Sequence, residues 1–266
     1  MGKKILRNNM ATFLFHDLIY GPIKSRRLGN SLGINLLPLE KKYCNFNCIY
    51  CECGANLPGR VGVLAKRTEV VNALRQKLSQ LKQENIELNS ITFAGNGEPT
   101  IHPDFKEIIS DTIDVRNQYF ENAQISVLSN ATKISDIQIV DTLKKVDNCI
   151  LKLDSAIDKT AIIINRPVGR YSVENTVNLL KRFDGNFVLQ TMFLSGEVCG
   201  QRINNYTLEE VEAWLQIVKT LSPKKVMIYT IARDTPEKKL EKAPHEALEQ
   251  IRQQVERLGI EISVSE

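Results

Sequence analysis

Short runs rich in β-branched and aromatic residues alternate with amphipathic stretches along most of this 266-residue chain. The strand-like runs are predicted at residues 33–37, 90–94, 124–128, 149–153, 186–193 and 225–230. Most of them are apolar nearly throughout, as expected of strands that are covered on both faces. Between them, apolar residues such as Val71, Leu74 and Leu78 recur at the spacing of an amphipathic helix. Strand–helix units in series predict a parallel sheet with right-handed crossovers.

The number of these units predicts the fold class. Six strand–helix units, rather than the eight of a closed barrel, indicate an α/β protein with a partial (β/α)6 TIM-like barrel. We expect one domain over residues 1–266, with its core at about 20–235 and a C-terminal helix and short strand at 243–264. In such barrels the chemistry lies at the carboxyl ends of the strands, so functional residues are expected there.

Composition excludes several classes of protein. Hydrophobic residues make up 42% and charged residues 25% of the chain, which is ordinary for a globular domain that needs no disulfides. The longest apolar runs fall far short of the ~20 residues of a membrane span, and the N-terminus carries no secretory pattern. The sequence therefore predicts a cytoplasmic protein that does not enter a membrane.

Basic residues are concentrated near the N-terminus. Residues 1–70 hold 11 basic and 4 acidic side chains, although the net charge of the whole chain is only +4. Such a region can attract RNA, an anionic substrate or an acidic redox partner, or it can be an ordinary solvated surface. A surface for RNA would use Lys24, Arg26, Arg27, Lys41 and Lys42.

A cluster of cysteines follows the first predicted strand. Cys44, Cys48 and Cys51 have the spacing C-x3-C-x2-C, and Cys53 follows one residue after Cys51. Three thiolates on one compact loop can ligate three irons of a [4Fe–4S] cluster and leave the fourth iron open to a ligand. The alternative is a structural zinc site with Cys53 as fourth ligand, although zinc sites usually use two separated pairs.

This loop resembles the signature of the radical S-adenosylmethionine (radical SAM) superfamily, C-x3-C-x-Φ-C, in which the aromatic residue Φ is here Tyr50. The resemblance implies a radical SAM core and two cofactors, a [4Fe–4S] cluster and S-adenosylmethionine, whose amino and carboxylate groups chelate the open iron. It implies cleavage of S-adenosylmethionine to methionine and a 5′-deoxyadenosyl radical that abstracts hydrogen from a substrate. It also implies a reducing partner such as flavodoxin or ferredoxin, and places Tyr50 in the wall of the adenine pocket.

The ends of the second and third predicted strands carry two further motifs. Gly95, Asn96, Gly97 and Glu98 resemble the GGE motif of the superfamily, with Asn96 in place of one glycine. The resemblance implies that this segment binds the methionine ammonium through backbone carbonyls and the acid. Asn130 resembles the family's Ser/Thr-Asn element and is a candidate to approach the cofactor, or else an ordinary turn residue.

The later strands complete the predicted cofactor site. Lys152 stands where family members often carry a small polar residue that contacts the ribose, and Asp154 follows it. Lys152 and Asp154 are candidates for contact with the cofactor or the substrate. Arg166 fits the family's arginine that pairs with the methionine carboxylate, because a guanidinium suits bidentate binding. The fifth and sixth strands add Gln190, Tyr229 and Ile231 to the candidates. Tyr229 and Ile231 would lie on the adenine side of the pocket, or else they are ordinary core residues.

Three cysteines lie outside the motif. Cys53 is predicted to be a bystander near the cluster, and Cys149 is predicted to be buried in the fourth strand. Cys199 lies in a segment, residues 195–205, that is predicted to be a loop over the barrel mouth. It is either a catalytic hydrogen-atom donor or substrate ligand, or a passive thiol.

Two segments narrow the resemblance within the superfamily. Residues 21–29 and 95–100 resemble a compact branch related to the wyosine-synthesising enzymes that act on transfer RNA. The substrate class stays open among an RNA base, a peptide and a small metabolite. The alternatives to a radical enzyme are a non-catalytic iron–sulfur protein for electron transfer or sensing, and an RNA-binding module.

Overall fold

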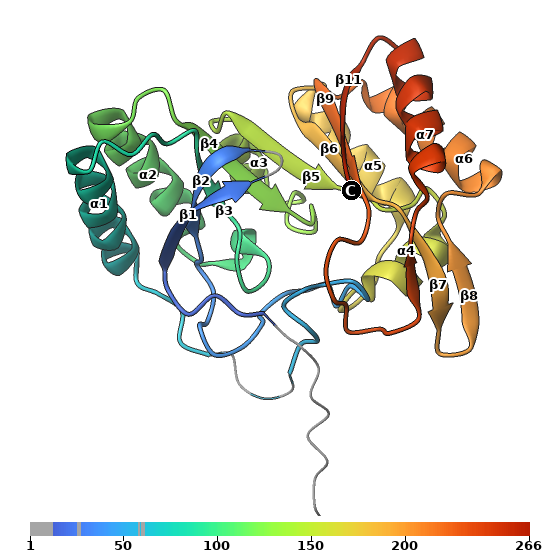
Figure 1. Ribbon diagram of the computed structural model, residues 1–266, viewed down its shortest axis with the longest axis horizontal. Coiled ribbons are helices and arrows are strands. Elements are labelled where there is room, and N and C mark those ends of the chain that lie inside the picture. The colour runs from blue at the N-terminus through green and yellow to red at the C-terminus, as the bar shows by residue number, and fades with distance from the viewer. Residues whose placement is uncertain (1–12, 26–27, 58, 60–61) are drawn as a thin grey trace, which may run out of the picture.

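The computed structural model describes residues 13–25, 28–57, 59 and 62–266 (Figure 1). Within these residues, eight strands form one curved sheet in the order β1-β2-β3-β4-β5-β6-β9-β11. In this order the strands span Ile19–Ser25, Gly29–Ile34, Ser90–Phe93, Gln124–Ser129, Asn148–Lys152, Val188–Met192, Lys225–Tyr229 and Glu261–Ser265. β1 runs antiparallel to β2, whereas each following pair of neighbours is parallel. The predicted partial barrel is therefore confirmed.

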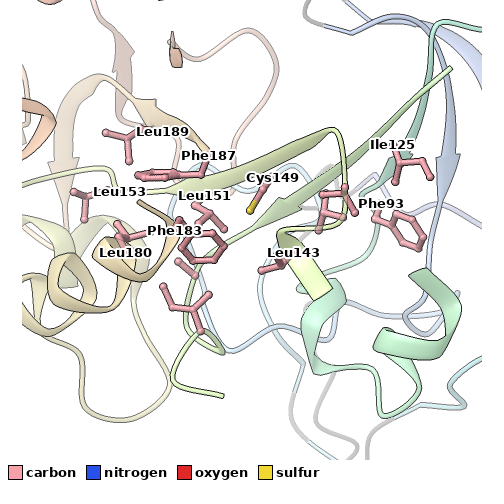
Figure 2. Close-up of a cluster of buried hydrophobic side chains, with 14 of the residues drawn as sticks. Phe93, Ile125, Leu143, Cys149, Leu151, Leu153, Leu180, Phe183, Phe187 and Leu189 are labelled. Carbon is pink, nitrogen blue, oxygen red and sulfur yellow. The ribbon is translucent and has the colours of Figure 1, made fainter. Parts of the chain in front are cut away.

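Helices cover the outer face of the sheet (Figure 1). They are α1 (Arg67–Gln83), α2 (Phe105–Tyr119), α3 (Ile137–Leu143), α4 (Asp158–Asn165), α5 (Val173–Leu180), α6 (Leu208–Leu221) and α7 (His245–Arg257). Apolar side chains at every second strand position meet the helices and form the main core, part of which Figure 2 shows. Cys149 lies in this core, as predicted, and burial raises the pKa of its thiol to about 12. No helix in the described part of the chain is long and apolar enough to cross a membrane.

The inner face of the first strands is polar. Ser31 and Thr92 are hydrogen-bonded at 2.7 Å, and Ser90 and Ser126 at 3.1 Å, all within the buried sheet. These strands therefore alternate between an apolar outer face and a hydroxyl-lined inner face. The expectation of strands apolar on both faces was wrong for this half of the sheet, because the barrel is open and its interior is not filled as an apolar core.

Two parts of the fold were not predicted. The first is the edge strand β1, which pairs with β2; β2 itself, at Gly29–Ile34, lies earlier than the run predicted at residues 33–37. A second sheet has the order β10-β7-β8, formed by Leu240–Lys242, Leu194–Val198 and Gln201–Asn204.

The prediction of a loop over residues 195–205 was therefore wrong. β7 and β8 form a hairpin whose turn residues, Cys199 and Gly200, have φ of 51° and 80°. Left-handed conformations at both central residues suit a tight two-residue turn between twisted strands.

Candidate functional site

The cysteine loop is held at the carboxyl ends of the parallel strands. Tyr43 N donates to the Asn96 carbonyl at 2.7 Å, which joins the loop to the segment after β3. On the other side, Ile49 N donates to the Ile164 carbonyl at 2.9 Å, which joins the loop to the end of α4. The loop therefore lies across the barrel mouth, where the chemistry of such barrels is expected.

Gly97 allows this close approach. A β-carbon built on Gly97 would lie 1.8 Å from the carbonyl oxygen of Tyr43, and Gly97 has a φ of +147°. Both facts demand glycine, because a side chain would collide with backbone and the backbone conformation is unfavourable for other residues. The second glycine of the motif thus positions the cysteine loop.

Hydrogen-bond donors surround the first two thiols of the motif. Cys44 Sγ accepts from the backbone N–H of Phe46 at 3.3 Å and lies 3.6 Å from Asn130 Nδ2. Cys48 Sγ accepts from Lys152 Nζ at 2.9 Å. Burial raises the pKa of Cys44 to about 12 in the absence of a metal. Burial also raises the pKa of Cys48, and Lys152 offsets part of that effect. The neighbouring donors therefore oppose the effect of burial and favour the thiolate, which is the form that binds iron.

The third thiol, Cys51, lies beside Cys53 and Lys42. A hydrogen bond from Cys53, together with the nearby charge of Lys42, lowers the pKa of Cys51 to about 5. The Lys42 ammonium is buried and donates to the Gly54 carbonyl at 3.0 Å. Its predicted place on a surface for RNA was therefore wrong. Arg26 and Arg27 of that surface lie outside the described residues.

The donor set fits an iron–sulfur cluster better than zinc. Among the described residues, no group of three or more His, Cys, Asp or Glu side chains is placed to hold a single metal ion. A tetrahedral zinc site needs its ligands to converge on one point, whereas each thiolate of a cluster binds a separate iron. Three thiols on one loop, each beside a hydrogen-bond donor, meet the second requirement.

Glu98 joins the ends of β3 and β4. Its buried carboxylate accepts from Thr100 N at 3.1 Å, Thr100 Oγ1 at 2.5 Å and Ser129 Oγ at 2.8 Å. The Asn130 N–H donates to its other oxygen at 2.6 Å. Burial raises the pKa of Glu98, and these hydrogen bonds offset part of that effect. The carboxylate therefore has a structural role here, and its predicted contact with the methionine ammonium stays a prediction.

We expect Glu98→Gln to destabilise the protein by about 1–3 kcal/mol, the cost of leaving one buried donor without its acceptor. The amide nitrogen would replace the oxygen that accepts from the Asn130 N–H, whereas the other oxygen keeps its donors. Urea unfolding of the apoprotein, followed by circular dichroism, measures the change. The exposed Glu121→Gln is the control, with a change below about 0.5 kcal/mol. Equal stability of the two variants would contradict this role of Glu98.

Asn96 connects the motif to the N-terminal segment. Its side-chain oxygen accepts from Phe15 N at 2.9 Å, and its side-chain nitrogen donates to the carbonyls of Phe15 and Pro38 at 2.8 and 2.9 Å. Its own carbonyl accepts from Tyr43 N. Asn96 is fully buried and holds this scaffold together, while Gly95 exposes part of its surface and accepts from Cys53 Sγ at 3.4 Å.

Asn130 bridges the end of β4 and the cysteine loop. Besides its approach to Cys44, its Nδ2 donates to Asn45 Oδ1 at 2.7 Å, and its Oδ1 accepts from Thr132 N at 3.0 Å. The structure thus brings this predicted residue beside the cysteine motif.

A buried ionic group lies between the cysteine loop and β5. The Asp154 carboxylate accepts from Tyr50 Oη at 2.6 Å, and the Lys152 ammonium lies 3.0 Å from it. The other Asp154 oxygen accepts from Met192 N at 3.0 Å. Burial works against the Lys152 ammonium, but the charges of Asp154 and Cys48 more than offset it and raise the pKa of Lys152.

The remaining candidates lie on the side of the mouth nearer the second sheet. Arg166, at the end of α4, forms an ion pair with Glu237 at 2.6 Å and lies 3.9 Å from the sulfur of Cys199. Gln190 is beside Lys152 in the sheet register. Tyr229 and Ile231 belong to a small apolar cluster that includes Ile49 of the cysteine loop and residues of β7 and β8.

Sequence reasoning missed Asn56, which organises the loop from within. Its Nδ2 donates to the carbonyls of Cys44 and Phe46 at 2.8 and 3.3 Å, and its N–H donates to Asn47 Oδ1 at 2.9 Å. An asparagine shortly after a cysteine motif is the one local signal that could have pointed to it.

The chain is thus an open α/β half-barrel that carries a cysteine loop across its mouth. The sequence model of the radical SAM superfamily matches residues 42–198, and the chain belongs to this superfamily. Members bind a [4Fe–4S] cluster and S-adenosylmethionine, so these are the cofactors of this chain as well.

Solved structures agree on the fold. A radical SAM methyltransferase from Sphaerobacter thermophilus superposes with a TM-score of 0.65 at 14% identity, covering 88% of this chain and 65% of that one. SuiB of Streptococcus suis, bound to S-adenosylmethionine, superposes with a TM-score of 0.60 at 14% identity, covering 87% and 50%.

Curated relatives match over part of their length. A protein named GTPase Obg, from Brachyspira hyodysenteriae, is 29% identical over 92% of this chain and 35% of its own length. A UPF0026 protein of Helicobacter pylori is 28% identical over 67% of this chain and 57% of its own length. A UPF0026 protein of Methanocaldococcus jannaschii is 26% identical over 83% and 65%. The chain thus spans between about a third and two thirds of these relatives.

Proposed function

We propose that this protein is a radical SAM enzyme whose [4Fe–4S] cluster is held by Cys44, Cys48 and Cys51. The observation that carries the proposal is the seating of all three thiols on one loop at the mouth of the half-barrel, among donors that suit thiolates. When bound and reduced, the cluster supplies the electron that cleaves S-adenosylmethionine to methionine and a 5′-deoxyadenosyl radical. The chain's own residues are proposed to orient the cofactor.

The two halves of S-adenosylmethionine are proposed to contact different strand ends. The methionine part would lie near Asn130 and the segment Gly95, Asn96, Gly97 and Glu98, with Arg166 facing its carboxylate. The adenosine part would contact Tyr50, Asp154, Gln190, Tyr229 and Ile231. Two observations support this arrangement. The side chains of Tyr50 and Asp154 are hydrogen-bonded to each other beside Lys152. Gln190 lies opposite Lys152 in the pairing of β5 with β6.

The hairpin of β7 and β8 is proposed to face the substrate. Cys199 is exposed at its tip and lies near the guanidinium of Arg166, a position from which a thiol could donate a hydrogen atom. We propose an RNA base, a peptide or a small metabolite as substrate, with flavodoxin or ferredoxin as reductant in the cytoplasm.

The test is anaerobic reconstitution with iron and sulfide, followed by reduction with dithionite in the presence of S-adenosylmethionine. We expect release of 5′-deoxyadenosine, measured by chromatography. Tight binding of S-adenosylmethionine in calorimetry should accompany it. A cluster that forms but neither binds nor cleaves S-adenosylmethionine would instead indicate a non-catalytic iron–sulfur protein.

A further inference from the structure

Lys152 is a buried cation placed directly against the cysteine motif. It is the last residue of β5, and its side chain is 10% exposed. Its ammonium lies 2.9 Å from Cys48 Sγ and 3.0 Å from Asp154 Oδ2. The rings of Tyr50 and Phe46 lie 4.8 and 5.4 Å from the nitrogen. Carboxylate, sulfur and aromatic faces all stabilise a cation, so the position of the ammonium is well determined.

The partners of Asp154 show why the cation is needed there. The carboxylate also accepts from Tyr50 Oη and from the backbone N–H of Met192, and its side chain is fully buried. Without Lys152, this carboxylate would stand uncompensated near Cys48. A buried uncompensated charge of the same sign as a thiolate is costly, and addition of an electron nearby would raise that cost.

We propose that Lys152 is a positioning residue that raises the reduction potential of the cluster by donating to the sulfur of Cys48 and by neutralising Asp154. This inference rests on the proposed function, since it requires Cys48 to be a cluster ligand. Hydrogen bonds to the sulfurs, net charge and solvent exposure are the factors that tune the potentials of iron–sulfur clusters. The Lys152 ammonium supplies both a hydrogen bond to sulfur and a positive charge, whether the cluster is oxidised or reduced. It stabilises the reduced cluster more than the oxidised one, because the reduced cluster carries one more negative charge.

The test is a redox titration of the reconstituted protein without S-adenosylmethionine, followed by electron paramagnetic resonance of the reduced cluster. Lys152→Met keeps the apolar stem and removes the charge. We expect its equilibrium constant for one-electron reduction to fall at least tenfold, a shift of about 59 mV to lower potential. Lys152→Arg keeps the charge, so its reduction potential should stay close to that of the wild type. Lys219→Met removes an exposed lysine of α6 and should leave the potential unchanged.

Asp154→Asn provides an independent arm in case Lys152→Met does not take up a cluster. Removal of the carboxylate leaves Lys152 with Cys48 as its charged partner, so the potential should shift upward. The double variant with Lys152→Met and Asp154→Asn should lie between the two single variants. Fully loaded single variants with the wild-type potential would overturn the role of Lys152 while leaving the proposed function intact. A wild-type protein that assembles no cluster would overturn the proposed function itself.

Discussion

A variant with Cys44, Cys48 and Cys51 all replaced by alanine is expected to lose both cluster binding and the release of 5′-deoxyadenosine. Cysteine thiolates are the ligands of such clusters, and the variant leaves no thiol of the motif to bind iron. Iron and sulfide analysis after anaerobic reconstitution should show less than about a tenth of the wild-type content. The absorbance of the cluster and the release of 5′-deoxyadenosine under dithionite should fall with it.

The matched control removes the same number of thiols elsewhere in the chain. A variant with Cys53, Cys149 and Cys199 replaced by alanine should still load a cluster, because none of these cysteines belongs to the motif. Circular dichroism of both variants shows whether the fold is retained. Unchanged 5′-deoxyadenosine release from the motif variant would refute the proposed function. If only the control variant lost the cluster, then cysteines outside the motif, and not those within it, would be the cluster ligands.

Replacement of Gly97 by alanine is expected to displace the cysteine loop. The new methyl group would lie 1.8 Å from the Tyr43 carbonyl oxygen. Either the cysteine loop or the segment around Gly97 must therefore move. Steric overlap and a φ of +147° each cost about 1–3 kcal/mol. Because a misplacement of about 1 Å can cost roughly 100-fold in rate, S-adenosylmethionine cleavage should fall by about that factor. Chromatography of 5′-deoxyadenosine measures the rate, and urea unfolding measures the stability.

Gly169→Ala separates steric overlap from backbone strain. Gly169 also has a positive φ, of +100°, but a β-carbon there would meet nothing within 4 Å. This variant should therefore lose stability through backbone strain alone, about 1–3 kcal/mol, and keep a loaded cluster. If Gly97→Ala and Gly169→Ala behaved alike, the close approach of the cysteine loop to Gly97 would not matter to function.

Local patterns were sufficient to predict much of this architecture. The parallel strands β3, β4, β5, β6 and β9 all overlap runs predicted from apolar and β-branched residues, and α7 and β11 form the helix and short strand predicted within residues 243–264, with β11 ending one residue beyond them. Such runs reflect burial against the outer helices, which depends on residues close together in the sequence. The edge strand β1 and the second sheet escaped prediction because their pairing partners, not their composition, make them strands.

The candidate site divides in the same way. The cysteine spacing and the glycine motif are local, so they could be recognised without a structure. By contrast, Lys152 and Cys48 are 104 positions apart, and Glu98 and Asn130 are 32 apart. Glu98 and Asn130 meet because β3 and β4 are neighbouring parallel strands whose carboxyl ends lie together. Lys152 and Cys48 meet because the cysteine loop crosses the barrel mouth from the end of β2 to the end of β5.

Sequence by itself thus determined the class of fold, the cysteine loop and the glycine motif after the second predicted strand. Only the tertiary structure decided that Lys42 and Lys152 are buried beside the thiols, and that Glu98 and Asn96 are occupied by protein donors and acceptors. It also decided that a hairpin, and not a loop, borders the mouth. The physical reason is that spacing along a chain constrains neighbours in sequence, whereas charge compensation and hydrogen bonding depend on which strand ends the sheet brings together.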